Sequence, residues 1–145
     1  MEPKKYSYSK SQNYTNIVLV LGLNTVFLYL IISSSSLLLS IAFGVLFLCM
    51  VALTVYFCRK FFFPLLRNET ALELDNEKLQ FYIDNKTIYW KDVESINYKE
   101  LKNGDWVVTF AFKNGSANIN VFQKYIAGDD KAIYNTITEY FEKYK

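Results

Sequence analysis

The uncharged stretch LLLSIAFGVLFLCMVALTVYFC, Leu37–Cys58, decides how the rest of the chain is organised. A helix needs about 20 apolar residues to cross the roughly 30 Å hydrocarbon core of a bilayer, and this stretch is long enough. A second apolar stretch, IVLVLGLNTVFLYLII, Ile17–Ile32, precedes it, and Ser33–Ser36 join the two. The first stretch reaches the spanning length with Asn16 and the serines, whose hydroxyls can bond to helix carbonyls. The sequence therefore predicts a transmembrane helical hairpin.

The predicted hairpin covers residues 16–60, with helices at about 16–34 and 36–59. Two other interpretations were weighed. A cleaved secretory signal would explain the early lysines, but no small-x-small cleavage site precedes the next apolar run. A soluble protein with two buried helices would need more chain than remains to cover them. We expect the hairpin.

The charges that flank the hairpin predict its orientation. Lysines precede the first helix and basic residues follow the second, whereas the connecting serines carry no charge; these basic residues are Lys4, Lys5, Lys10, Arg59, Lys60 and Arg67. The positive-inside rule then places both termini in the cytoplasm. The expected location is the cytoplasmic (inner) membrane, in a multi-pass arrangement. The two cysteines, Cys49 and Cys58, lie in the second span, so neither a disulfide framework nor a cysteine zinc site is expected.

Small residues predict how the two helices pack. Residues spaced by four share one helix face and allow two backbones to approach closely. The second helix carries Ser36, Ser40 and Gly44 at this spacing, and Gly22 and Asn24 could supply the opposing surface. An alternative is that Asn24 and Thr25 line a path for a solute. Without an ionisable residue inside the membrane, simple packing is the favoured interpretation.

The remaining residues divide into a tail, a linker and a soluble domain. Residues 1–15 are expected to be a cytoplasmic N-terminal tail. Residues 61–68, FFFPLLRN, are expected to be an interfacial linker in which Pro64 ends the helix. In residues 69–145, alternating apolar positions predict six strands, at 70–75, 78–84, 87–90, 94–101, 106–113 and 117–122. Turn signals separate them, at Asn76-Glu77, Asn85-Lys86, Asn103-Gly104 and Asn114-Gly115. An amphipathic helix at 129–145, with Asp129 or Asp130 as N-cap, closes the domain.

One motif carries a resemblance to a known family. Ile88-x-Trp90-x-Asp92-Val93-x-x-Ile96 resembles the I-x-W-x-D-I-x-x-I core of bacterial pleckstrin-homology-like (PH-like) domains. In these small membrane proteins one or two membrane helices precede the domain. The stretch LELDNEKLQFY, 72–82, resembles the first hairpin of that family. The resemblance implies an α+β membrane protein: a two-helix transmembrane hairpin, then a small antiparallel β PH-like domain closed by a C-terminal α-helix. Whether the domain has six or seven strands stays open.

We interpret the motif as structural. Burying an aliphatic side chain contributes about 1.5–3 kcal/mol, so Ile88, Trp90, Val93 and Ile96 are expected in the core. Asp92 is expected to accept backbone N–H bonds at the corner after Trp90. A catalytic or metal-binding role for this acid is disfavoured.

Composition argues against an enzyme. The chain has no histidine, and its five glycines do not form a phosphate-binding loop, so no cofactor and no metal are expected. Residues 1–67 have a net charge of +5 and residues 68–145 a net charge of −3. The soluble domain therefore lacks the concentrated basic patch that nucleic acid or phosphoinositides would require.

The remaining class of function is the binding of a partner. Tyr82 and Tyr89, with Lys86 and Lys91 nearby, form a candidate partner surface. We expect a non-enzymatic membrane-anchored protein whose PH-like domain mediates protein or self interaction at the cytoplasmic membrane face. The alternative is a bacterial immunity protein that neutralises a bacteriocin or secreted toxin at the membrane. The expected partners are the lipid bilayer and an unidentified protein (a toxin under the alternative) or a second copy.

Overall fold

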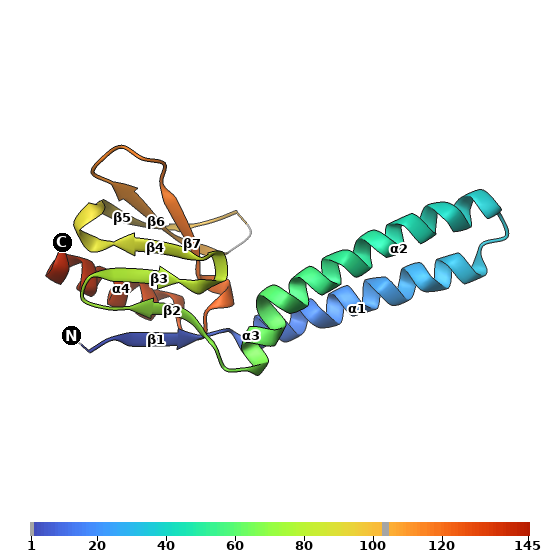
Figure 1. The fold of residues 1–145 in the computed structure, drawn as a ribbon, viewed down its shortest axis with the longest axis horizontal. Coiled ribbons are helices and arrows are strands. Elements are labelled where there is room, and N and C mark those ends of the chain that lie inside the picture. The colour runs from blue at the N-terminus through green and yellow to red at the C-terminus, as the bar shows by residue number, and fades with distance from the viewer. Residues whose placement is uncertain (1, 103–104) are drawn as a thin grey trace. The chain divides into compact units, whose positions relative to one another are not determined.

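The structure, a computed structural model, describes residues 2–102 and 105–145 (Figure 1). The chain forms two compact units: a helical unit, Lys10–Arg67, and a sheet unit made of Met1–Ser9 and Asn68–Lys145. The predicted fold class is confirmed at this level: two long apolar helices are followed by antiparallel sheets and a C-terminal helix. The predicted turn at Asn103-Gly104 lies outside the described residues.

The helical unit is a hairpin of two long helices, α1 (Lys10–Ser33) and α2 (Leu37–Phe57). Helical structure continues beyond α2 through a π-helical turn, η1 (Cys58–Phe62), and a short helix, α3 (Phe63–Leu66). Both segments, Lys10–Ser33 and Leu37–Leu66, are long and apolar enough to cross a membrane. None of the residues of α2, all of which the structure describes, is buried.

Pro64 does not end the helix, contrary to the prediction. Proline lacks the N–H that an α-helix interior requires, and its ring clashes with the preceding turn. Here it lies in the first turn of α3, immediately after the π-helical turn, where the altered bonding pattern accommodates it. The helix ends instead after Leu66. Asn68, with a φ of 52°, then takes the left-handed conformation common just after helix ends.

A polar bond joins the two helices near the middle of α1. The Asn24 side chain donates to Thr54 Oγ1 at 2.8 Å and to the Val20 carbonyl at 2.9 Å. Thr54 Oγ1 in turn donates to the Met50 carbonyl at 2.7 Å. Asn24 therefore bonds across the hairpin, but to Thr54 and not to the face of Ser36, Ser40 and Gly44.

The predicted close approach at the glycines is not found. A Cβ added to Gly22 or to Gly44 would meet nothing within 4 Å, leaving room for a side chain at both positions. The Asn24–Thr54 bond thus joins the two helices without a close approach at Gly22 or Gly44.

The sheet unit contains two antiparallel sheets. One has the order β1-β2-β3-β4, formed by Lys4–Ser7, Thr70–Leu74, Lys78–Phe81 and Lys86–Tyr89. The other has the order β5-β6-β7, formed by Val93–Glu100, Trp106–Phe112 and Ile119–Phe122. Short 3₁₀ turns follow β3, β4 and β7, at Tyr82–Asp84 (η2), Trp90–Asp92 (η3) and Gln123–Tyr125 (η4).

The structure has one strand more than the six predicted. This additional strand is β1, and it lies in the region that was expected to be an N-terminal tail. It pairs with β2, with Lys5 opposite Glu73 and Tyr6 opposite Leu72. Further bonds hold this end of the chain in the sheet unit: Ala127 N donates to the Ser7 carbonyl, and Ser9 N donates to the Tyr125 carbonyl, both at 2.8 Å. Residues 2–9 are therefore part of the sheet unit, and the helical hairpin lies in the sequence between its first two strands.

Most of the motif residues are in the core. Ile88, Trp90 and Val93 are fully buried, and Ile96 is half-buried. Trp90 also joins two segments, because its indole N–H donates to the Asp75 carbonyl at 2.8 Å and its backbone N–H to the Glu77 carbonyl at 3.0 Å. Burial of a large ring together with a satisfied indole N–H explains a tryptophan at this corner.

Asp92 acts through its backbone rather than its carboxylate. Its side chain is exposed and accepts no hydrogen bond in the described part of the chain, whereas its main-chain carbonyl accepts one from Lys113 N at 3.0 Å. The carboxylate that does cap a turn is Asp75, which accepts bonds from Glu77 N at 2.7 Å and Lys78 N at 2.8 Å. The predicted Asp92 cap is therefore replaced by the Asp75 turn.

The C-terminal helix, α4, covers Asp130–Tyr144. Asp129 is its N-cap, as predicted, and its side chain accepts a bond from Ala132 N at 2.9 Å. One face of the helix is buried, through Ile133, Thr136, Ile137, Tyr140 and Phe141. The opposite face is consequently turned outward.

We expect a pH-dependent contribution from Glu73 to the attachment of β1. Its carboxylate lies 3.0 Å from Lys5 Nζ and accepts a 2.8 Å bond from the Tyr82 hydroxyl, and the Tyr82 and Lys5 hydrogen bonds lower its pKa. A lowered pKa in the folded state stabilises at higher pH, and this contribution is lost as the carboxylate becomes protonated. Glu73→Gln should therefore destabilise the sheet unit by about 0.5 kcal/mol near pH 7.

The measurement is the thermal unfolding midpoint of the full chain in detergent, with Glu77→Gln, an exposed turn position, as the matched control. The difference between Glu73→Gln and wild type should shrink towards zero as the pH falls to about 3. A difference that stays constant over this range would contradict the account.

Candidate docking groove

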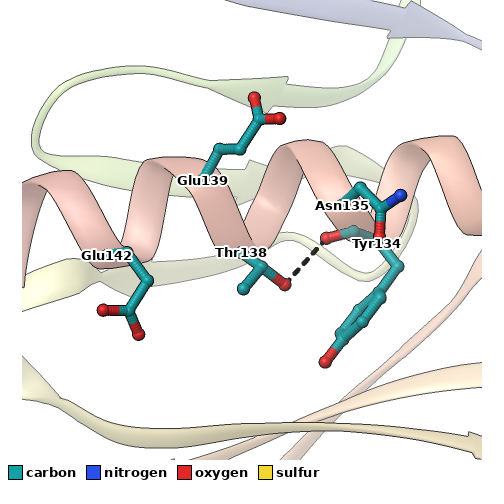
Figure 2. A pocket seen from close by; sticks show the side chains of 5 residues that line it. All are labelled: Tyr134, Asn135, Thr138, Glu139 and Glu142. Atoms are coloured by element: carbon teal, nitrogen blue, oxygen red, sulfur yellow. Dashed lines mark hydrogen bonds between the residues drawn. The ribbon is translucent and has the colours of Figure 1, made fainter.

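A groove of about 410 Å³ lies along the outward face of α4. Two rows of side chains line it at helical spacing: Tyr134, Thr138 and Glu142 form one row, and Asn135 and Glu139 the other (Figure 2). Its volume falls in the range that binding sites for small molecules or single side chains occupy. The five lining residues include an aromatic ring and two carboxylates.

The position of the groove is fixed by the packing of α4 on the core and by a hydrogen bond inside the helix. The buried face of α4 packs on the core, which fixes the helix. Thr138 Oγ1 donates to the Tyr134 carbonyl at 3.0 Å, so its hydroxyl proton is used inside the helix (Figure 2). Tyr134, Asn135, Glu139 and Glu142 therefore remain as the side chains that can meet a ligand.

A stack of three aromatic rings connects the groove to strand β5. The Tyr98 ring lies 4.5 Å from the Trp106 ring, at an interplanar angle of 9°, and 4.5 Å from the Tyr134 ring, at 16°. Two nearly parallel neighbours at this distance must lie on opposite faces of the Tyr98 ring. Tyr134 therefore lies on the opposite face of the Tyr98 ring from Trp106.

One edge of β5 has no strand partner among the described residues. This strand pairs with β6, from Val93 opposite Phe112 to Glu100 opposite Trp106. Within the described residues no strand pairs with its other edge. Outward residues such as Asn97 and Lys99 are exposed. The aromatic stack joins β5 to the α4 groove through the side chains of Tyr98 and Tyr134.

Acidic side chains dominate the electrostatics of this region. Burial raises the pKa of Tyr98, and Asp130, Asp129 and Glu100 raise it further because they oppose a negative phenolate. Burial and then Asp129 and Asp105 raise the pKa of Asp130. Negative charge is therefore concentrated around the stack.

The two carboxylates of the groove differ in their partners. Glu139 makes no ion pair or hydrogen bond within the described chain, whereas Glu142 is 2.5 Å from Lys145 Nζ. Both side chains of that pair are about half exposed, so the pair is weak and easily exchanged. The groove therefore presents one unpartnered carboxylate and a second that is available by exchange.

The described side chains also show which chemical groups are available around the groove. Among the described residues, no group of three or more His, Cys, Asp or Glu side chains could hold a metal ion. The Tyr98 hydroxyl is buried and, in the part of the chain that the structure describes, has no hydrogen-bond partner. The groove offers a ring face, carboxylates and an amide, which are groups that recognise a ligand.

The structure divides the candidate partner surface of the sequence analysis into two parts. Tyr82 and Lys86 lie at one end of the β3–β4 hairpin, whereas Tyr89 and Lys91 lie at the other, because Lys78 pairs with Tyr89 and Phe81 with Lys86. Both tyrosines are exposed, at 45% and 44%. Lys91 Nζ lies 5.9 Å from the centre of the Tyr89 ring, and Lys86 contacts Asp84 and the Asn120 carbonyl.

The α4 groove and the aromatic stack were not found from the sequence. Tyr98 and Trp106 lie in the predicted strands at 94–101 and 106–113, and Tyr134 lies in the predicted helix at 129–145, but no local pattern places the three rings together. The pairing of Glu100 with Trp106 places Tyr98 diagonal to Trp106 on one face, and this pairing could have suggested their contact. The position of α4 beside them is set by tertiary packing.

Comparison with protein-family models, with curated proteins and with solved structures finds no match to this chain.

Two buried tyrosine hydroxyls should respond differently to removal. The Tyr98 hydroxyl has no partner among residues 2–102 and 105–145, whereas the Tyr140 hydroxyl donates to the Glu2 carbonyl. Removing an unpaired buried polar group relieves a desolvation cost, whereas removing a paired one loses a hydrogen bond of about 1 kcal/mol. Tyr98→Phe should therefore leave the stability unchanged or raised, and Tyr140→Phe should lower it by about 1 kcal/mol.

Hydrogen exchange of the full chain in detergent measures both variants together. Tyr140→Phe should also speed exchange in β1, because Glu2 is next to that strand in the sequence. Equal losses of stability in the two variants would contradict the assigned bonding.

Proposed function

We propose that this chain is a non-enzymatic membrane-anchored docking protein. In this proposal α1 and α2 span the cytoplasmic membrane as a hairpin, and the sheet unit is a PH-like domain that binds a partner protein at the cytoplasmic face. The observation that carries the proposal is the exposure of apolar side chains over both helices. Leu38, Leu48, Tyr29 and Ile32, for example, are 76%, 68%, 68% and 75% exposed. Water is a poor solvent for such a surface, and hydrocarbon is a good one.

The distribution of charge supports the membrane part of the proposal. All fourteen acidic residues lie outside residues 10–67, and that segment holds only the basic residues Lys10, Arg59, Lys60 and Arg67. In an antiparallel hairpin these four lie at the same end, as the positive-inside rule requires of the cytoplasmic side. Lys60 Nζ lies 5.8 Å from the Tyr56 ring centre and 5.5 Å from the Phe61 ring centre. Aromatic rings beside basic groups are typical of the membrane interface.

The sheet topology supports the PH-like part. A four-stranded and a three-stranded antiparallel sheet, closed by one C-terminal helix, agree with the architecture that the motif at 88–96 implies. The motif residues Ile88, Trp90 and Val93 occupy core positions at the junction of the two sheets in the sequence. The structure and the PH-like architecture therefore agree in the order of their elements and in which motif residues are buried.

The docking part is supported by the surface of the sheet unit. The sheet unit carries a groove that contains an aromatic ring, and β5 has an edge that no described strand pairs with; both features are common where one polypeptide recognises another. With twelve lysines and fourteen acids, the sheet unit is mildly acidic. An acidic surface favours a protein partner over nucleic acid or anionic lipid.

The proposal is tested by crosslinking the tagged full chain in its native membrane, purifying it in detergent and identifying by mass spectrometry what co-purifies. A protein recovered in stoichiometric amount supports docking, and a secreted toxin in that position would establish the immunity alternative. Recovery as a dimer supports self-docking. Recovery of the uncrosslinked single chain alone would overturn the proposed function.

A further inference from the structure

We propose that the N-terminal part of α1 holds one anionic phospholipid of the bilayer. The acyl chain of this lipid lies in a groove on the outer surface of α1, and its phosphate lies beside Lys10. This inference rests on the proposed function, because it takes the helical hairpin to span a membrane. It adds a ligand and a binding site within the helical unit.

The groove, called the α1 groove below, has a volume of about 570 Å³ and is lined by Tyr14, Thr15, Val18 and Leu19. Residues four apart lie above one another on an α-helix, so Tyr14 and Val18 form one row and Thr15 and Leu19 the next. Thr15 has the smallest side chain of the four, which leaves space among its larger neighbours. The volume falls in the range of sites that bind small molecules.

The lining of the α1 groove suits a hydrocarbon chain. Tyr14, Val18 and Leu19 are apolar side chains exposed on the outer surface of the helix. Thr15 is also exposed and contributes a methyl group. Covering such a surface with an acyl chain is favourable, because the chain replaces water at apolar atoms.

An aromatic contact holds one wall of the groove. The ring centres of Tyr14 and Phe62 lie 6.1 Å apart at an interplanar angle of 81°, which is an edge-to-face arrangement. Phe62 belongs to η1, and its ring centre lies 6.4 Å from that of Phe63. The Tyr14 ring is thus supported by the chain itself, so the groove is formed before a ligand binds. A preformed groove loses little conformational freedom on binding.

Lys10 supplies the charge for the headgroup. It is the first residue of α1 and lies four residues before Tyr14, which places it on the same row as Tyr14 and Val18, one helical turn further towards the N-terminus. Its side chain is exposed. A lipid whose chain follows this row therefore brings its phosphate next to the Lys10 ammonium group.

The charges of the helical unit favour an anionic lipid over a zwitterionic one. Residues 10–67 contain no acidic residue, and Arg59, Lys60 and Arg67 lie at the same end of the hairpin as Lys10. An anionic phosphate therefore meets only positive charge within this unit. A headgroup that carries its own cation would fit the groove equally well but gain less from these basic residues.

The extent of the groove favours a single chain over a second copy of the hairpin. Its lining runs from Tyr14 to Leu19, which is about 7.5 Å of helix axis at 1.5 Å per residue. Packing of one helix on another uses side chains spaced along several turns of both helices. An acyl chain needs only a narrow strip of apolar surface.

The test uses the full chain in nanodiscs made from equal amounts of phosphatidylglycerol and phosphatidylcholine with identical acyl chains. Native mass spectrometry of the chain released from the discs counts the lipid molecules that stay bound. The wild-type chain should retain one phosphatidylglycerol, in about fivefold excess over phosphatidylcholine, because one lysine near an anionic lipid is worth about that factor.

Protein variants assign the bound lipid to the site. Lys10→Gln should lower the excess of phosphatidylglycerol about threefold to fivefold, whereas Lys99→Gln, a matched control on β5, should leave it unchanged. Thr15→Phe fills the groove and should remove the retained molecule of either lipid. Thr25→Phe changes another threonine of the same helix outside the groove and should not. All four side chains are exposed, so these variants should fold normally.

The inference is overturned if the wild-type chain retains both lipids equally or neither, if Lys10→Gln behaves like Lys99→Gln, or if Thr15→Phe behaves like Thr25→Phe. Release as a lipid-free dimer would assign the groove to a second copy and would also overturn it. Its failure is distinguishable from failure of the proposed function. A chain that enters the nanodiscs without retaining a preferred lipid keeps its membrane anchor and loses only this site. A chain that does not enter them has no membrane anchor.

Discussion

The structure depends on one constraint. Within the helical unit, the apolar surfaces of α1 and α2 are covered only where the two helices contact each other. No residue of α2 is buried, and Asn13 and Ile17 are the buried residues of α1. Two helices in contact can each bury only one stripe. The remaining faces require an apolar environment, and the complete absence of acidic residues from 10–67 is consistent with that requirement. The sheet unit, by contrast, closes its own core and carries every acidic residue of the chain.

The hairpin is inserted in the sequence between two strands that pair with each other. Strand β1 precedes the hairpin and β2 follows it, yet β1 and β2 are neighbours in one sheet. The sheet unit is therefore assembled from residues on both sides of the hairpin, and it can close only after the whole hairpin has been synthesised.

Much of the fold could be predicted because it rests on local patterns. The alternation of Leu79, Phe81 and Ile83, the turn at Asn85 and the Asp129 cap are local signals, and the structure confirms them. Strand β1 could not be found this way, because KKYS at 4–7 is polar and its pairing with β2 spans the whole hairpin. Pro64 was misread for a related reason: a π-helical turn is not marked by any single residue type. The aromatic stack depends on where α4 packs, which is a tertiary property.

The central claim is that the hairpin lies in a bilayer while the sheet unit lies outside it. Spin labels test this most directly, with both native cysteines replaced and single cysteines placed at Leu48, Ser35 or Glu77 of the full chain in liposomes. Accessibility to dissolved oxygen and to a polar nickel chelate is then compared at each position. The account predicts that the label at position 48 is reached by oxygen and hardly by nickel, whereas labels at 35 and 77 are reached readily by nickel. Equal nickel accessibility at positions 48 and 77 would show that α2 is not in the membrane.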